Sequence, residues 1–485
     1  MTDSLVTGRE AEKAILDSIT ASSKASLVAV YGRRRVGKTY LIRTCLQKQM
    51  VFQFSGVHYV TTEIQLEQFT TALSKQLNKG IDLPVPADWF KAFELLSKLL
   101  AKKIRTKKAV VFLDEFPWMQ TPKSNFLSAF EHFWNTWAAQ QNNLAVILCG
   151  SAASWMLQEV VRNRGGLHNR ITHKIPLMPF TLYETEQFLR YKNIQLNHYE
   201  ITQLYMTMGG IPYYLEQAKP GLSAAQITDA ACFTKNGFLY KEFTELYQSL
   251  FDKADRHIKV VRALAAKPMG LSRSQIIKTC KLQSGGSTTA LLEDLTASGF
   301  ITPYLPVGKK TKDNIYKLTD AFSLFYLKFM EPNRSGGKGT WLRLSDTPSW
   351  KSWSGLAFET VCLRHLPAVK RALGISGMYT QASIWRSKNN SDKDAVQVDL
   401  VLTRRDNCIN LFELKFCNDV FVIDKKYAAA LLKNKNSFKQ ETQTRKQLFI
   451  TLITSMGLRI NEHSLGLVDQ SLTIDQLFVP FEYED

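Results

Sequence analysis

The segment LVAVYGRRRVGKTY, residues 27–40, joins an apolar run to three arginines with a glycine on either side, and a lysine follows the second glycine. It fits the pattern G-x-x-x-x-G-K-[ST], whose defining positions are Gly32, Gly37, Lys38 and Thr39. The glycines let the backbone curl, so that successive N–H groups point at a phosphate, and the following helix adds its positive N-terminal end. An apolar strand before this loop and a helix pattern after it are the context that the motif requires. The segment therefore predicts a nucleotide site in which Lys38 contacts the β- and γ-phosphates and Thr39 binds Mg²⁺.

The variable positions of the loop are Arg33, Arg34, Arg35 and Val36. We expect the backbone of these residues to border the bound ATP. We expect the three arginine side chains to point outward, into solvent or toward another domain.

Apolar runs and helix-like spacing alternate along the first 220 residues. The strands are expected at 27–32, 50–56, 109–115 and 144–151, with helices at 63–78 and 88–103 between them. Near-continuous apolar strands that alternate with helices are typical of a parallel sheet covered on both faces. The pattern predicts an α/β domain.

An acid pair ends one of these strands, in VVFLDE, residues 110–115. Asp114 is in a position to hold Mg²⁺ through water, and Glu115 to orient and deprotonate an attacking water. Ser151 follows another strand, at the sheet edge where ligands bind in α/β proteins. Its hydroxyl is expected either to sense the γ-phosphate or to cap the strand.

Arginines beyond the last of these strands are candidates for stabilising transition-state charge. Arg162, Arg164 and Arg170 lie in RNRGGLHNR, and each is also explained as surface charge. We favour Arg170, acting within its own chain or on a neighbouring subunit of a homo-oligomer.

Several motifs occur in an order that resembles a prokaryotic family, the archaeal-type P-loop ATPases of the AAA-like and STAND NTPase group. These motifs are GREAEKAIL, GRRRVGKT, VVFLDEF, GSAASWM, HNRITHKIPLMPF and GGIPYYL. Longer members of the family carry a C-terminal domain of the PD-(D/E)XK nuclease type, and the ending that starts at LFELKF resembles theirs. In the family, Tyr-Gly precedes the finger arginine, whereas His168 and Asn169 precede Arg170 here. The role of Arg170 therefore stays open.

The resemblance implies four domains. They are a P-loop ATPase core at 1–180, a helical lid at 181–250, a winged helix at 251–330 and an α/β restriction-endonuclease-like domain at 342–485. The segment EPNRSGGKGTW, residues 331–341, has the composition of a linker before the last domain.

The middle region supports a winged helix independently, with Ser272 as the expected N-cap of its second helix. Residues 251–350 contain 16 Lys and Arg against 8 Asp and Glu. Winged helices bind DNA, and Lys309, Lys310 and Lys312 of the wing would contact its backbone. Glu293 and Asp294 on the third helix suit DNA poorly, so a protein–protein spacer is the alternative.

Carboxylates recur in the C-terminal region. Asp399 lies in the expected strand VQVDLVL, while Glu413 and Lys415 share one side of the strand INLFELKF. Two acids and a lysine in this grouping bind a divalent metal and activate water for phosphodiester hydrolysis. Glu359, from the helix SGLAFETVCLRHL, is a fourth candidate. An ion pair on a half-exposed sheet is the alternative for the E-x-K pattern.

The charge and composition of the chain limit the classes of partner that it is expected to bind. The net charge of +19 favours polyanions, with DNA as the expected partner, although solubility alone also explains it. No apolar run reaches the roughly 20 residues of a membrane span, and the N-terminus does not resemble a signal peptide. The seven scattered cysteines form no C-x-x-C pair and suit a reducing cytoplasm.

Three hypotheses follow from these observations. The first is an ATPase whose nucleotide state controls DNA binding and metal-dependent DNA cleavage. The second is a regulatory NTPase switch whose nuclease-like domain binds nucleic acid or a protein without cutting. The third, a transporter-associated or signalling ATPase, is disfavoured by the positive charge and by the lack of a membrane segment in the sequence.

Overall fold

The computed structural model describes residues 6–104, 107–162, 165–387 and 397–480, without the side chain of Asp399. The chain divides into two compact units, Met1–Met178 and Pro179–Asp485. Arg164 lies outside the described residues, so its expected role has no structural account.

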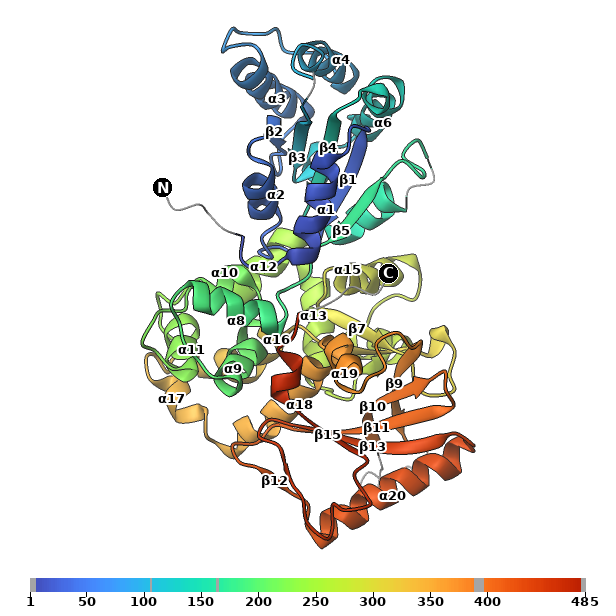
Figure 1. The fold of residues 1–485 in the computed structure, drawn as a ribbon. Coiled ribbons are helices and arrows are strands. Elements are labelled where there is room, and N and C mark those ends of the chain that lie inside the picture. Colours follow the sequence, from blue (N-terminus) through green and yellow to red (C-terminus); the bar gives the residue numbers. More distant parts are fainter. Residues whose placement is uncertain (1–5, 105–106, 163–164, 388–396, 481–485) are drawn as a thin grey trace. The chain divides into compact units, whose positions relative to one another are not determined.

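The first unit is built on a five-stranded parallel sheet with the order β2-β3-β4-β1-β5 (Figure 1). Its strands are β1 (Ser26–Tyr31), β2 (Met50–Ser55), β3 (Ala109–Asp114), β4 (Leu144–Gly150) and β5 (His173–Pro176). Its helices are α1 (Glu10–Ala21), α2 (Lys38–Leu46), α3 (Thr62–Leu77), α4 (Trp89–Leu100), α5 (Phe116–Met119), α6 (Phe126–Thr136) and α7 (Ala153–Trp155). A 3-10 helix, η1 (Ala138–Gln140), and a π-helix, η2 (Met156–Val161), complete the unit.

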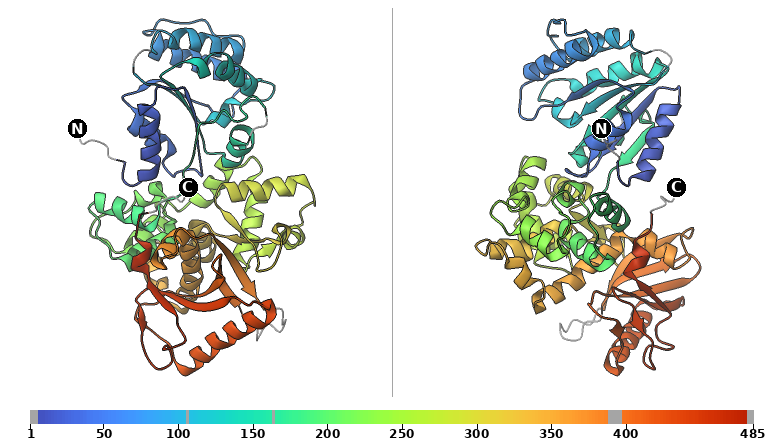
Figure 2. Two further views of the ribbon diagram at one scale, coloured as in Figure 1. Left: turned by 45° about the vertical axis from the view of Figure 1, so that its right-hand side comes forward. Right: turned by 60° about the vertical axis from the view of Figure 1, so that its left-hand side comes forward.

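Burial on both faces explains why the strands read as unbroken apolar runs. All residues of β3 and β4 are buried, although successive side chains point to opposite faces. Alternate residues of β1–β4 form one core cluster with α3, α4 and α6. Helices cover both sides of the sheet (Figure 2). The α/β parallel sheet and its four strands are confirmed, whereas β5 was not expected.

The strand order places β4 between β1 and β3. Because the strands are parallel, their carboxyl ends meet at one edge of the sheet. The glycine-rich loop after β1, the acid pair after β3 and the serine after β4 therefore converge.

The second unit begins with a helical region. Its helices are α8 (Leu182–Tyr191), α9 (His198–Met208), α10 (Pro212–Leu215), α11 (Ala224–Cys232) and α12 (Glu242–Leu250). Side chains of Thr181, Asn197 and Ser223 cap the N-termini of α8, α9 and α11. These caps satisfy the backbone N–H groups at the helix starts.

Three helices and a three-stranded antiparallel sheet follow, in the region where the sequence predicts a winged helix. The elements are α13 (Ala254–Ala265), β6 (Leu271–Ser272), α14 (Arg273–Cys280), α15 (Gly286–Ala297), β7 (Ile301–Tyr304), η3 (Thr311–Asp313) and β8 (Ile315–Leu318), with the sheet order β6-β8-β7. The side chain of Ser272 caps α14 as predicted, in a capping box with Gln275.

The segment 331–341 is held in place, in contrast to the linker that its composition suggests. Both carboxylate oxygens of the buried Asp229 accept backbone hydrogen bonds from it, from Gly339 N at 2.7 Å and Trp341 N at 2.8 Å. The Trp341 ring is buried and stacks on Phe233. The polar composition reflects turns, whereas the anchoring contacts come from distant residues.

The remaining helices lie in the chain between β8 and the C-terminal sheet. They are α16 (Ala321–Phe325), η4 (Tyr326–Met330), η5 (Glu331–Asn333), α17 (Thr340–Leu344), α18 (Pro348–Arg364) and α19 (Leu366–Ala372).

A mixed five-stranded sheet with the order β15-β13-β11-β10-β9 completes the second unit. Its strands are β9 (Thr380–Arg386), β10 (Gln397–Arg404), β11 (Cys408–Lys415), β13 (Gln447–Thr454) and β15 (Gln470–Thr473). The pairs β9–β10 and β10–β11 are antiparallel, whereas β11–β13 and β13–β15 are parallel. The other elements are β12 (Phe421–Val422), α20 (Lys425–Thr442), β14 (Leu458–Arg459) and η6 (Ile474–Leu477). Strands β10, β11 and β13 were expected, and β9 and β15 were not.

Candidate nucleotide-binding site

The two glycines of the loop after β1 have backbone conformations that other residues adopt with strain. Gly32 has φ +149°, and a Cβ atom built there would lie 2.2 Å from Leu177 O. Leu177 is fixed in turn, because its N–H donates to Tyr31 O at 2.7 Å. Gly37 has φ +92° and directly precedes α2. The loop therefore passes so close to residue 177 that only glycine fits at position 32.

Lys38 at the start of α2 is buried, with 6% of its surface exposed. Its ammonium donates to two carbonyls of its own loop, Gly32 O and Arg33 O, both at 2.9 Å. Burial lowers the pKa of Lys38, while the negative groups near it, including Asp114 and Glu115, act in the opposite direction. The cation thus lies inside the curl of the loop, next to the acid pair.

Asp114 connects this loop to the end of β3. Its Oδ2 accepts from Thr39 Oγ1 at 2.9 Å and from Ser55 Oγ, at the end of β2, at 3.3 Å. Its Oδ1 accepts from Glu115 N at 3.1 Å. The hydroxyl of Thr39 and the carboxylate of Asp114 therefore form a pair of adjacent oxygens, from two distant segments of the chain.

Glu115 turns toward β4, with a left-handed backbone (φ +45°). Its Oε2 accepts two hydrogen bonds from Ser151, one from the backbone N at 3.1 Å and one from Oγ at 2.8 Å. The structure thus gives Ser151 a partner that neither sequence-based reading foresaw. Strand β4 lies next to β3 in the sheet, so Ser151 after β4 comes close to Glu115 after β3.

The arginines of the loop differ in exposure. Arg33 is buried, at 3% exposed, so its side chain does not extend into solvent. Arg34 and Arg35 are half-buried, and the charge of Arg34 acts on Lys38. The pattern G-x-x-x-x-G-K-[ST] leaves these positions unspecified, so it carries no signal for their burial.

The charge of Arg162, one of the finger candidates, acts on the end of β1. It opposes the rise that burial causes in the pKa of Tyr31, the residue before Gly32. Arg170 is exposed in the turn before β5, and within the described residues its side chain makes no hydrogen bond or ion pair.

Arg9, the residue before α1, contacts the loop, and sequence reasoning missed this contact. Arg9 is buried, its Nη2 donates to Val36 O at 3.2 Å, and its Nη1 lies 3.6 Å from Glu12 Oε1. The motif GREAEKAIL contained both residues, and a charged pair at the very start of a helix was the available signal.

A second polar cluster lies in the C-terminal sheet. Lys415 Nζ is 2.8 Å from Glu413 Oε1, and the Tyr427 hydroxyl donates to the same oxygen. The Lys415 ammonium lies 5.3 Å from the centroid of the Tyr427 ring. Burial raises the pKa of Tyr427, and the Glu413 charge adds to the rise. The cluster therefore combines a carboxylate, an ammonium and a neutral phenol.

Asp399 and Glu359 are the other two candidates for this second site. The side chain of Asp399 lies outside the described residues. Glu359 lines a pocket together with Tyr304 of β7 and Lys317 of β8. Among the side chains that the structure describes, no group of three or more His, Cys, Asp or Glu residues is arranged to hold a metal ion.

Asp294 on α15 contacts the neighbouring helix α13. Its Oδ2 lies 3.4 Å from His257 Nε2, and Asp294 is half-buried whereas Glu293 is exposed. Lys309, Lys310 and Lys312 of the wing are exposed as expected. The base of the wing is tied to the C-terminal sheet, because Val307 N donates to Ile384 O of β9 at 3.2 Å.

Residues 7–218 match a protein family described as an ATPase domain predominantly from Archaea. An uncharacterized protein of Methanocaldococcus jannaschii is 24% identical over 405 residues, which cover 81% of this chain and 86% of that protein. A Walker-type ATPase of Pyrococcus abyssi aligns with a TM-score of 0.45 and 19% identity, over 66% of this chain and 96% of its own. The ORC2 protein of Aeropyrum pernix aligns with a TM-score of 0.42 and 13% identity, over 71% and 96%. No helix within the described residues is long and apolar enough to span a membrane.

Proposed function

We propose that this chain binds ATP at the loop 32–37 and hydrolyses it, because residues 7–218 match a family described as an ATPase domain predominantly from Archaea. The observation that carries the proposal is the convergence of Lys38, the Thr39–Asp114 pair and Glu115 at one edge of the sheet. Binding without hydrolysis would not need a carboxylate of the Glu115 type beside the phosphates.

Phosphate binding would use the loop and the start of α2. The N–H groups of the curled loop and the positive end of α2 attract the phosphate charge. Lys38 would exchange its bonds to Gly32 O and Arg33 O for the β- and γ-phosphate oxygens. Arg9 would keep the loop in shape through Val36 O.

The oxygens of Thr39 and Asp114 suit Mg²⁺, since this ion prefers hydroxyl, carboxylate and water oxygens. Thr39 would bind it directly and Asp114 through water. When bound, the ion supplies positive charge that stabilises the phosphates in the transition state.

Glu115 would orient the attacking water and accept its proton at a carboxylate oxygen. Ser151 occupies Oε2 through two hydrogen bonds, so it holds the carboxylate in one orientation. Arg162 or Arg170 would stabilise the charge of the transition state, Arg170 within its chain or across subunits of a homo-oligomer.

We propose further that the nucleotide state of this site controls DNA binding and metal-dependent DNA cleavage by the second unit. The exposed wing lysines would contact the DNA backbone. Glu413 and Lys415 lie 2.8 Å apart, and an acid with a lysine is the grouping that positions a metal and a water. Asp399 and Glu359 would complete this PD-(D/E)XK-like site.

The alternative is a regulatory switch whose C-terminal domain binds nucleic acid or a protein without cutting. One observation favours it: Glu413 is already bonded to both Lys415 and Tyr427. A metal ion would have to displace at least one of these contacts.

Titration calorimetry with ATP and Mg²⁺ tests the binding step. Wild type should bind, Lys38→Ala should not, and Lys48→Ala, an exposed lysine after α2, should bind as wild type does. Absence of heat from any adenine or guanine nucleotide with the wild-type chain would refute the proposal.

Plasmid incubation with Mg²⁺ or Mn²⁺, with and without ATP, separates the two readings of the second unit. Cleavage that Asp399→Ala and Lys415→Ala abolish supports a nuclease. No cleavage under any condition supports the switch.

A further inference from the structure

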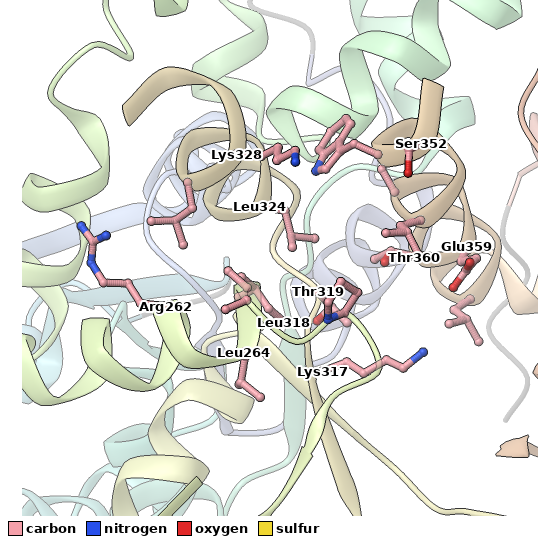
Figure 3. A pocket seen from close by; sticks show the side chains of 18 of the residues that line it. Arg262, Leu264, Lys317, Leu318, Thr319, Leu324, Lys328, Ser352, Glu359 and Thr360 are labelled. Carbon is pink, nitrogen blue, oxygen red and sulfur yellow. The ribbon is translucent and has the colours of Figure 1, made fainter. Parts of the chain in front are cut away.

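A pocket of about 630 Å³ lies within the second unit, between the winged helix and α18. Its walls come from α13, from β7 and β8, from the α16–η4 segment and from α18 (Figure 3). Pockets that hold small molecules have volumes of roughly 300–1,000 Å³ and occur preferentially between domains. All residues that line this pocket belong to the second unit.

The middle of the pocket is apolar. Leu318 and Leu324 lie between the side marked by Arg262 and the side marked by Glu359 (Figure 3). Trp353 and Leu356 add aromatic and aliphatic surface from α18. A ligand with an apolar body would gain most of its binding energy here, by removing these surfaces from water.

Lys317 is the cation that distinguishes this pocket from an apolar cleft. The residue is 8% exposed, yet it lines the cavity, and its side chain extends toward the Glu359 side (Figure 3). Within the described residues its ammonium makes no hydrogen bond or ion pair, and it lies 5.9 Å from the centroid of the Tyr304 ring. A mostly buried ammonium that faces a cavity is an anchor for an anion.

The other charged side chains that line the pocket determine which net charge a ligand should carry. Arg262 is already neutralised, because both of its terminal nitrogens donate to Glu331, at 2.7 and 2.6 Å. The carboxylate of Glu359 also lines the pocket, and Lys328 is exposed at its edge. One buried cation next to carboxylates attracts a single negative charge and repels a polyphosphate or a nucleic-acid backbone.

We propose that this pocket binds a small organic monoanion. Its carboxylate or phosphodiester group pairs with Lys317 Nζ, and its apolar body lies against Leu318, Leu324 and Trp353. Because β8 and α18 supply different walls, the bound ligand bridges the winged helix and the C-terminal domain.

Two fluorescent probes with the same body test the proposal in the full-length protein. The probe 1-anilinonaphthalene-8-sulfonate carries one sulfonate, and N-phenyl-1-naphthylamine lacks it. Wild type should bind the sulfonate more tightly. Lys317→Met should weaken the sulfonate about tenfold and leave the neutral probe within about twofold, because only the charge-assisted contact is lost.

Controls place the probe in this pocket. Lys317→Arg should retain the preference for the sulfonate, and Lys309→Met, which removes an exposed charge on the wing, should change nothing. Trp353→Phe should reduce energy transfer from the protein to the probe. Circular dichroism checks that each variant folds.

Leu356→Trp provides a test that does not depend on Lys317. Leu356 is 39% exposed at the rim, so a larger side chain there is tolerated and should block both probes. Equal affinity of wild type and Lys317→Met for the sulfonate would overturn the proposal. So would unchanged binding of both probes in Leu356→Trp.

Discussion

His365, between α18 and α19, makes the stability of the second unit depend on pH. The ring is 1% exposed, its Nε2 accepts from Leu182 N at 2.8 Å, and its Nδ1 donates to Val361 O at 2.7 Å. These two contacts require the neutral ring, since a protonated Nε2 cannot accept. Burial lowers the pKa of His365 from 6.5 to about 4.

The sign of the effect follows from this difference. Below pH 6.5 the unfolded chain takes up a proton that the folded chain refuses until about pH 4. The stability contributed by the neutral ring is therefore complete above pH 6.5 and is lost as the pH falls to about 4. At about 1.4 kcal/mol per pKa unit, the loss amounts to about 3 kcal/mol.

Urea unfolding followed by pulse proteolysis at pH 7 and pH 4.5 measures this loss for the second unit. His365→Gln, which keeps an acceptor and cannot titrate, should flatten the pH dependence by most of the predicted amount. His463→Gln, a half-exposed histidine of the same unit, should leave it unchanged. An unfolding free energy with the same pH dependence in wild type and His365→Gln would refute the reasoning.

Three further outcomes follow from the contacts described above. Gly32→Ala should abolish ATP binding in calorimetry, because its Cβ would lie 2.2 Å from Leu177 O; wild-type affinity would contradict the close approach. Arg9→Ala should weaken ATP binding several-fold while circular dichroism shows a folded chain, because Val36 O loses its donor; an unchanged dissociation constant would show that the loop needs no brace. Asp229→Ala should lower the unfolding free energy of the second unit by about 2 kcal/mol, since two backbone N–H groups lose a charged acceptor, with Asp229→Asn less affected; equal stability of wild type and Asp229→Ala would contradict the anchoring of residues 331–341.

Local patterns predicted the parts of the fold that short segments determine. The apolar runs of β1, β3 and β4 and the N-cap at Ser272 depend on neighbouring residues, and each is confirmed. The strands β5 and β9 escaped prediction, because β5 has only four residues and the pattern of β9 is partly polar.

Contacts between distant segments were not predictable in the same way. The hydrogen bonds from Ser151 to Glu115 follow from the position of β4 between β1 and β3, and strand order is not written in any local pattern. The burial of Arg33 and the contact of Asp294 with His257 likewise depend on what packs against each residue. The match of residues 7–218 to an ATPase-domain family is the one signal that relates these distant segments to each other.

Steady-state ATP hydrolysis by wild type and Glu115→Gln, with nucleotide binding measured on the same samples, tests the central claim most directly. Wild type should hydrolyse ATP, and Glu115→Gln should bind ATP with similar affinity but lose at least about a hundredfold in kcat, as expected when a general base is removed. Equal turnover by the two proteins would contradict the claim that Glu115 activates the attacking water.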